Sequence, residues 1–206
     1  MPLIQSGNGL AQEKVNPGSI LPRVPEVAPQ NSLAGQALVE ALRRGGFVLY
    51  LRHTETGVIG DDCEKSNLTD AGRAEAKRIG NALRALRLPI DKIVSSDVCR
   101  VLETAKLMDV APIEINEDLH RGPKRSDHRI HEARNRLLAV APPTGSNRLL
   151  AGHMQAGESP EERLFLDMGE IIVFRPISGG RPVPVARVRA GEWQSLIDAA
   201  APPPPK

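Results

Sequence analysis

Residues 47–53 read Phe-Val-Leu-Tyr-Leu-Arg-His, an apolar run that ends in an arginine and a histidine. A short and continuous apolar run is typical of a strand that is buried on both faces of a parallel sheet. Apolar residues at helical spacing flank this run, from about residue 32 to 44 before it and from about 67 to 88 after it. The stretch therefore predicts a buried strand with Arg52 and His53 at its carboxyl end.

The same alternation of apolar runs and amphipathic segments continues along the chain. Further strands are predicted at 92–95, 148–151, 171–174 and 183–188, with a brief extended segment near Glu114, and further helices at 97–108, 127–140 and 191–199. Ser32 is placed to cap the first helix, and either Asn67 or Thr69 the second. Strands that alternate with helices predict the α/β class, as a three-layer α/β/α fold with a mainly parallel sheet.

The two ends of the chain differ in composition from its centre. Residues 1–31 are rich in Gly, Pro, Asn, Ser and Gln and lack an apolar period, which predicts an irregular N-terminal arm. Four consecutive prolines mark a stiff, Pro-rich tail at 200–206. A chain of 206 residues leaves room for one domain of ordinary size, which we place at 32–199.

Composition argues against two classes of partner. The net charge of +2 creates no large field of one sign, and three Phe, one Tyr and one Trp are too few for the stacking platforms that bind single-stranded nucleic acid. No apolar segment approaches the roughly 18 residues of a membrane helix. We therefore expect no nucleic acid partner and no membrane span, and the oligomeric state stays open. No basic segment followed by an apolar core marks an intact secretory signal.

Basic residues lie at the carboxyl ends of three predicted strands, where ligands collect in α/β folds. Arg52 and His53 follow the first of these strands. Arg100 lies shortly after the second, and His153 follows the strand at 148–151. Two guanidinium groups suit a tetrahedral dianion, because each offers forked donors and a permanent charge. A neutral histidine beside them can attack phosphorus, so the pattern predicts a pocket for a phosphoryl group.

Three ordered motifs carry a family resemblance. Residues 51–56 (Leu-Arg-His-Thr-Glu-Thr) resemble the RHG-type signature of the histidine phosphatase superfamily, which includes cofactor-dependent phosphoglycerate mutases. Residues 95–105 (Ser-Ser-Asp-Val-Cys-Arg-Val-Leu-Glu-Thr-Ala) resemble the SSxxxRxxETA segment of that family, and Gly152-His153 resembles its second histidine. The similarity covers about residues 38–196. Within the family, the chain looks most like small exported bacterial members. This resemblance implies a periplasmic or secreted protein, and a cytoplasmic location stays open.

This resemblance implies a phosphoglycerate mutase-like fold and the activity of a phosphomonoesterase. His53 would be the phosphorylated nucleophile, with Arg52, Arg100 and His153 completing the phosphate pocket. The partner would be a small phosphorylated substrate or phosphate, of unknown identity. The resemblance implies a metal-independent hydrolase with no cofactor. Glu103, within the second motif, is expected to have a structural role, such as holding an arginine.

Two positions depart from the pattern of the family. Thr54 replaces the glycine that usually follows the first histidine, which alters the freedom of the loop. Arg121 stands where many relatives carry a glutamate that protonates the leaving oxygen. Among the nearby candidates, His120 is favoured over Glu117 and Asp118, because an imidazole donates a proton near neutrality with little tuning. The alternative function is a catalytically impaired protein of the same fold that binds phosphate or a phospholigand.

The two cysteines lie in or beside the first two motifs, so a fold that assembles these motifs brings Cys63 and Cys99 near one another. A disulfide and two free thiols are equally compatible with the sequence, and a disulfide would favour an oxidising compartment such as the periplasm. Neither is the nucleophile of a cysteine phosphatase, which needs an arginine six residues later. Thr69 and Ala105 stand at those positions.

Other phosphate chemistries find no support in the sequence. No GxxxxGK[ST] loop and no HExxH zinc motif is present. His128 and His131 lie one helical turn apart without a third ligand at the spacing of a zinc motif. We expect these two histidines on a solvated helix face and predict no metal site.

Overall fold

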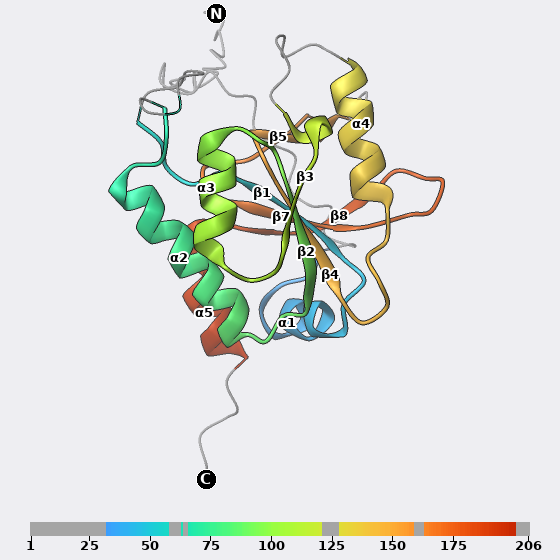
Figure 1. Ribbon diagram of the computed structural model, residues 1–206. Helices are drawn as coiled ribbons and strands as arrows, with labels where there is room; N and C mark the ends of the chain where they lie inside the picture. The colour runs from blue at the N-terminus through green and yellow to red at the C-terminus, as the bar shows by residue number, and fades with distance from the viewer. Residues whose placement is uncertain (1–31, 58–62, 64–65, 121–127, 159–162, 201–206) are drawn as a thin grey trace, which may run out of the picture.

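The computed structural model describes residues 32–57, 63, 66–120, 128–158 and 163–200. The arm predicted at 1–31 and the tail from residue 201 onward lie outside the described residues. The centre of the described chain is a six-stranded sheet with helices packed on both faces (Figure 1). This arrangement confirms the predicted three-layer α/β/α class.

The strands of the main sheet are β1 (Val48–Arg52), β2 (Ile90–Ser95), β3 (Ile113–Ile115), β4 (Asn147–Gly152), β7 (Ile171–Arg175) and β8 (Val183–Val188). Their order is β3-β2-β4-β1-β7-β8. The pairs β3–β2, β2–β4 and β4–β1 are parallel, whereas β7 runs antiparallel to both β1 and β8. The sheet is mixed and mostly parallel, and its parallel part carries the carboxyl ends of β1, β2 and β4 to one edge.

The α-helices of the described chain are α1 (Gly35–Arg44), α2 (Asp70–Ala85), α3 (Cys99–Met108), α4 (His128–Ala139) and α5 (Trp193–Ala199). Helices α1, α2, α3 and α5 share one face of the sheet, where Ile79 and Val101 join Leu49 in one apolar core. On the other face, Tyr50 joins Leu138 of α4 in a second core. Successive residues of β1 thus point into different cores, as the pleat of a strand requires. Within the described ranges, no helix is both long and apolar enough to span a membrane.

The caps of the first two helices differ from each other. The Thr69 hydroxyl accepts a hydrogen bond from the backbone N–H of Gly72 at 3.0 Å, so Thr69 rather than Asn67 is the N-cap of α2. The prediction that Ser32 caps α1 is wrong. The N-cap of α1 is Ala34, and no side-chain cap hydrogen bond forms there. This helix is held instead by the apolar stripe that it buries.

The sequence predicts that this helix starts at residue 97, but helix α3 begins at Cys99. Val98 has an extended backbone, and its N–H donates to the Ser96 hydroxyl at 3.3 Å. These interactions keep residues 96–98 in a loop at the edge of the sheet. Asp97 is therefore a loop residue beside the predicted site.

Several short elements are not predicted by the sequence pattern. Strands β5 (Gln155–Glu158) and β6 (Arg163–Phe165) pair with each other in a separate antiparallel sheet. Two short 3-10 turns, η2 (Glu117–Leu119) and η3 (Ala190–Glu192), precede α4 and α5. The strand β5 reads Gln-Ala-Gly-Glu, which lacks the apolar alternation that marks a strand.

Candidate active site

The carboxyl ends of the parallel strands bring the two predicted histidines together. The register pairs Leu51 of β1 and Ser95 of β2 with the same residue of β4, Ala151. His53 directly follows β1 and His153 directly follows β4. Their ring centroids lie 5.8 Å apart, and the ring planes are inclined at 73°. The sheet edge chosen from the sequence is therefore the edge at which these side chains meet.

His53 is held in one tautomer by its own loop. Its Nδ1 lies 2.9 Å from the carbonyl oxygen of Thr54, which can only accept, so Nδ1 carries the proton and Nε2 has the lone pair. The residue is 5% exposed, and burial is the main reason that its pKa falls to about 4. The Thr54 hydrogen bond opposes this shift, while the charges of Arg52 and Arg100 add to it. At pH 7 the ring is neutral, and Nε2 can act as a nucleophile.

Arg100 and His153 complete the buried part of the site. Arg100 lies in the first turn of α3 and is 3% exposed. Nε2 of His153 lies 3.4 Å from the Ser96 hydroxyl oxygen. Burial, followed by the charge of Arg100, lowers the pKa of His153 to about 2. This second ring is therefore also neutral at pH 7, and the arginines supply the positive charge of the site.

Tyr50 supports His153 from the core beneath it. The backbone N–H of His153 donates to the phenol oxygen of Tyr50 at 3.1 Å, and burial raises the pKa of this phenol. A Cβ atom at Gly152 would overlap the Tyr50 ring, which explains why glycine precedes the histidine. Nothing in the sequence marks Tyr50 for this role, because an aromatic residue within a buried apolar run is expected to be core alone.

Arg52 is oriented by a segment far away in the sequence. Its Nη1 donates to the carbonyl oxygen of Leu166 at 2.8 Å. This segment is held by the buried carboxylate of Glu170, whose Oε2 accepts from the backbone N–H of Asp167 and from Nη1 of Arg187, both at 2.8 Å. Neither Glu170 nor Arg187 lies in a motif, so the sequence carries no signal for their role.

Thr54, the residue that departs from the family pattern, links the first motif to the second. Its backbone N–H donates to the Thr104 hydroxyl at 3.2 Å, and the two hydroxyl oxygens lie 3.3 Å apart. The Thr104 hydroxyl in turn donates to the carbonyl oxygen of Arg100 at 2.7 Å. Thr54 thus does not loosen its loop but ties His53 to the helix that carries Arg100.

Glu103 has the structural role expected from the sequence. Its Oε1 accepts from Nε of Arg73 on α2 at 2.8 Å. Arg73 also contacts Asp70 at 3.2 Å, in the first turn of the same helix. The second motif therefore uses its glutamate to join α3 to α2.

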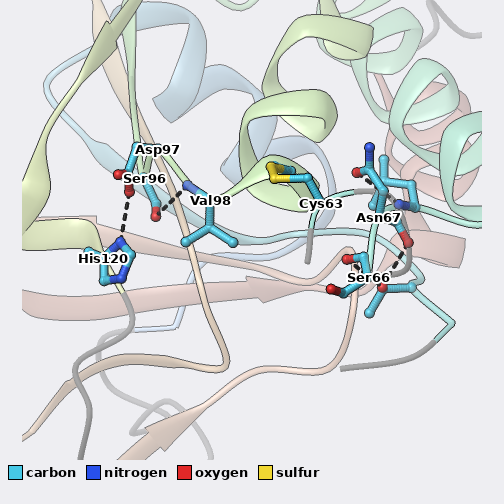
Figure 2. The surroundings of a disulfide bond; sticks show 10 residues. Cys63, Ser66, Asn67, Ser96, Asp97, Val98 and His120 are labelled. Atoms are coloured by element: carbon cyan, nitrogen blue, oxygen red, sulfur yellow. Dashed lines mark hydrogen bonds and ion pairs between the residues drawn. A yellow bond between two sulfur atoms is a disulfide. The ribbon is translucent and has the colours of Figure 1, made fainter. Parts of the chain in front are cut away.

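The three candidates for the leaving-group acid lie on and after η2. Glu117 and Asp118 are exposed within this turn, and His120 follows it. The ring of His120 is half-exposed and contacts Asp97, with Nδ1 and Oδ1 2.7 Å apart (Figure 2). Arg121 lies outside the described residues. The sequence motifs point to His120, but they carry no signal for its carboxylate partner Asp97.

Cys63 and Cys99 form a disulfide, which resolves the alternative left open by the sequence (Figure 2). Their Cα atoms lie 5.6 Å apart, and 36 residues separate them in sequence. Cys99 directly precedes Arg100 in the first turn of α3. The bond therefore joins the chain after the first motif to the start of the helix that carries a site arginine.

We expect the double substitution Cys63→Ser and Cys99→Ser to lower the free energy of unfolding by about 3–4 kcal/mol. A cross-link of this sequence separation restricts the unfolded chain by roughly that amount. Urea unfolding of the oxidised, reduced and doubly substituted proteins measures this difference. The reduced protein and the doubly substituted protein should have the same free energy of unfolding. Two titratable thiols in the unfolded, unreduced protein would contradict this prediction.

The described residues contain no group of three or more His, Cys, Asp or Glu side chains placed to hold a metal ion. His128 and His131 form part of helix α4, but their side chains lie outside what the structure describes. The cationic groups that surround His53 are those of arginines.

Part of the chain matches a known protein family. Residues 48–121 match the histidine phosphatase superfamily (branch 1), a segment that includes Arg52, His53 and Arg100. The serine/threonine-protein phosphatase Pgam5, mitochondrial, of Drosophila virilis is 38% identical over 61 residues, which cover 30% of this chain and 21% of that protein. The same protein of Drosophila grimshawi is 33% identical over 66 residues, covering 32% and 23% of the two chains. The match thus spans less than a quarter of these relatives.

Solved structures share the fold over most of the chain. SixA from Nakamurella multipartitia superposes with a TM-score of 0.51 at 19% identity, covering 70% of this chain and 95% of that chain. The protein histidine phosphatase SixA complexed with tungstate gives a TM-score of 0.51 at 15% identity, covering 71% and 98%. At such low identity these similarities establish the architecture and leave the activity to be argued from the site.

Proposed function

Because residues 48–121 match the histidine phosphatase superfamily (branch 1), we propose that the chain is a phosphomonoester hydrolase that works through a phosphohistidine on His53. The state of His53 carries this proposal. Its ring is buried and neutral, with the proton on Nδ1 and the lone pair on Nε2. Arg52 and Arg100 lie close enough for their charges to act on this ring. A nucleophile beside two guanidinium groups is what transfer of a phosphoryl group requires.

The proposed reaction has two displacements. First, Nε2 of His53 bonds to phosphorus while the bond to the leaving oxygen breaks, and Arg52 and Arg100 offset the charge on the equatorial oxygens. Water then attacks phosphorus, the bond to His53 breaks, and inorganic phosphate leaves. Because the two arginines supply permanent positive charge, the proposal needs no metal ion.

The leaving oxygen must gain a proton when it belongs to an alcohol. We assign this proton to His120, because its ring, although exposed like Glu117 and Asp118, is held by a hydrogen bond to Asp97. A nitrophenolate leaves without such help, since it is a weak base. Activated esters are therefore the best first substrates for an assay.

The proposed substrate class is a phosphorylated small molecule or protein side chain. Pgam5 is named as a serine/threonine-protein phosphatase and SixA as a protein histidine phosphatase, which supports a phosphorylated substrate. Tungstate in the SixA complex is a tetrahedral oxyanion, as phosphate is. The Cys63–Cys99 disulfide supports our proposal of an oxidising compartment such as the periplasm.

We expect the purified protein to hydrolyse 4-nitrophenyl phosphate, with a rate that EDTA does not change. Release of nitrophenolate measures this activity, and a panel of phosphomonoesters then ranks natural substrate classes. Loss of turnover in EDTA with rescue by a divalent ion would contradict the metal-independent mechanism. Binding of phosphate without any turnover would instead favour a phospholigand-binding protein.

A further inference from the structure

Asp97, in the loop after β2, and His120, directly after η2, form a hydrogen-bonded pair (Figure 2). Nδ1 of His120 lies 2.7 Å from Oδ1 of Asp97, and the two side chains are 51% and 52% exposed. The hydrogen bond from His120 is the main reason that the pKa of Asp97 lies below its usual range, so this carboxylate is ionised and only accepts. Nδ1 therefore holds the shared proton, and Nε2 can exchange a proton with another group.

Hydrogen bonds anchor both the backbone N–H and the backbone carbonyl group of His120. Its N–H donates to the carbonyl oxygen of Glu117 at 2.9 Å. Its own carbonyl oxygen accepts from Nη2 of the buried Arg134, on α4, at 2.9 Å. The preceding residue, Leu119, is fully buried in the core beneath α4. With Asp97 holding the ring, the imidazole has a defined orientation although half of it is exposed.

Asp97 also connects this pair to His153, one of the two buried histidines of the site. It follows Ser96, whose hydroxyl oxygen lies 3.4 Å from Nε2 of His153. The same hydroxyl accepts from the backbone N–H of Val98, which fixes the loop on both sides of Asp97. Burial is the main cause of the low pKa of His153, and the charge of His120 contributes to it. The pair is therefore within electrostatic reach of the reacting centre.

We propose that Asp97 is a positioning residue, which keeps Nδ1 of His120 protonated and directs Nε2 to the leaving oxygen. The pair would take the place of the carboxylic acid that is missing at position 121, and the inference rests on the proposed function. In the first displacement, Nε2 of His120 gives its proton to the leaving oxygen as the phosphorus–oxygen bond breaks. In the second, Nε2 takes a proton from the attacking water as the bond between phosphorus and His53 breaks. Asp97 stabilises the imidazolium form of His120, which donates the proton in the first displacement and is formed again in the second.

The decisive experiment compares two leaving groups. Asp97→Asn keeps the size of the side chain and removes its charge, and exposed ion pairs contribute little to stability, so the variant should fold. We expect kcat/KM for ethyl phosphate to fall about 10–100-fold, within the range of general-acid effects, and that for 4-nitrophenyl phosphate to change less than about twofold. A merely structural role would lower both rates together.

His120→Ala and the double variant provide a second readout. His120→Ala should show the same selective loss, and adding Asp97→Asn to it should cause no further loss, because the two residues act as one unit. The matched control is Glu114→Gln, which removes another exposed ion pair, with Lys92 at 2.6 Å, between β2 and β3. This control should leave both substrates unaffected.

Each other outcome is decisive. Equal losses for the two substrates, no loss, or additive losses in the double variant would overturn the role of Asp97 and leave the phosphatase proposal standing. If the wild-type protein hydrolyses only the nitrophenyl ester, the claim that His120 protonates the leaving oxygen is wrong. A wild-type protein that hydrolyses neither ester would refute the proposed function, and this inference with it.

Discussion

His53→Ala is expected to lower kcat for 4-nitrophenyl phosphate by on the order of 10⁶-fold, as loss of a covalent nucleophile does in other enzymes. The reason is that Nε2 of His53 would form the bond to phosphorus in the first displacement. The variant should still fold, since the ring contributes one hydrogen bond to the Thr54 carbonyl, and alanine fits the same backbone. Initial rates with purified protein measure the loss of kcat, and circular dichroism tests whether the variant is folded.

A covalent intermediate gives this prediction an independent readout. Wild-type protein incubated with a ³²P-labelled phosphomonoester should retain label that is lost in acid and kept in base, as a phosphohistidine is, whereas His53→Ala should retain none. His128→Ala is a matched histidine control, from the start of α4, and should behave as wild type. Normal turnover by a folded His53→Ala protein would exclude the proposed mechanism.

The fold was predictable where local and global signals agree. The apolar run before Arg52 is short enough to be a buried strand, and the cap at Thr69 and the apolar period of α2 define a helix after it. Parallel pairing of neighbouring strands then sends their carboxyl ends to one edge. That geometric rule was sufficient to bring His53 and His153 together without any knowledge of the side-chain contacts.

The parts that sequence reasoning missed depend on tertiary contacts. The carboxylate of Glu170 is buried because Arg187 pairs with it, and nothing local in either residue indicates that this pair orients Arg52 through the Leu166 carbonyl. Asp97 was assigned to a helix, since the sequence does not reveal that Val98 is extended. Individual motifs locate reacting groups, whereas the residues that orient these groups come from distant segments.

Arg100→Ala is expected to lower kcat/KM for 4-nitrophenyl phosphate by about 10²–10³-fold, in line with the ~2.7–4 kcal/mol lost when one preorganised donor is deleted from a transition-state site. Arg100 is 3% exposed, so its charge acts with little screening by water. Arg100→Lys keeps a charge but loses the planar fork that matches two phosphate oxygens, and should recover only part of the loss. Arg44→Ala, an exposed arginine in the last turn of α1, is the matched control.

A second measurement separates an electrostatic role of Arg100 from a loss of folding. Burial is the main cause of the low pKa of His53, at about 4, and the charges of Arg52 and Arg100 lower it further. Removing Arg100 takes away a positive neighbour, which favours the imidazolium, so the pKa of His53 should rise in Arg100→Ala and by less in Arg100→Lys. NMR titration of the His53 ring measures this shift in the folded protein. An unchanged pKa together with normal kcat/KM would show that Arg100 does not act at the reacting centre, and the phosphate would then have to be held by other groups.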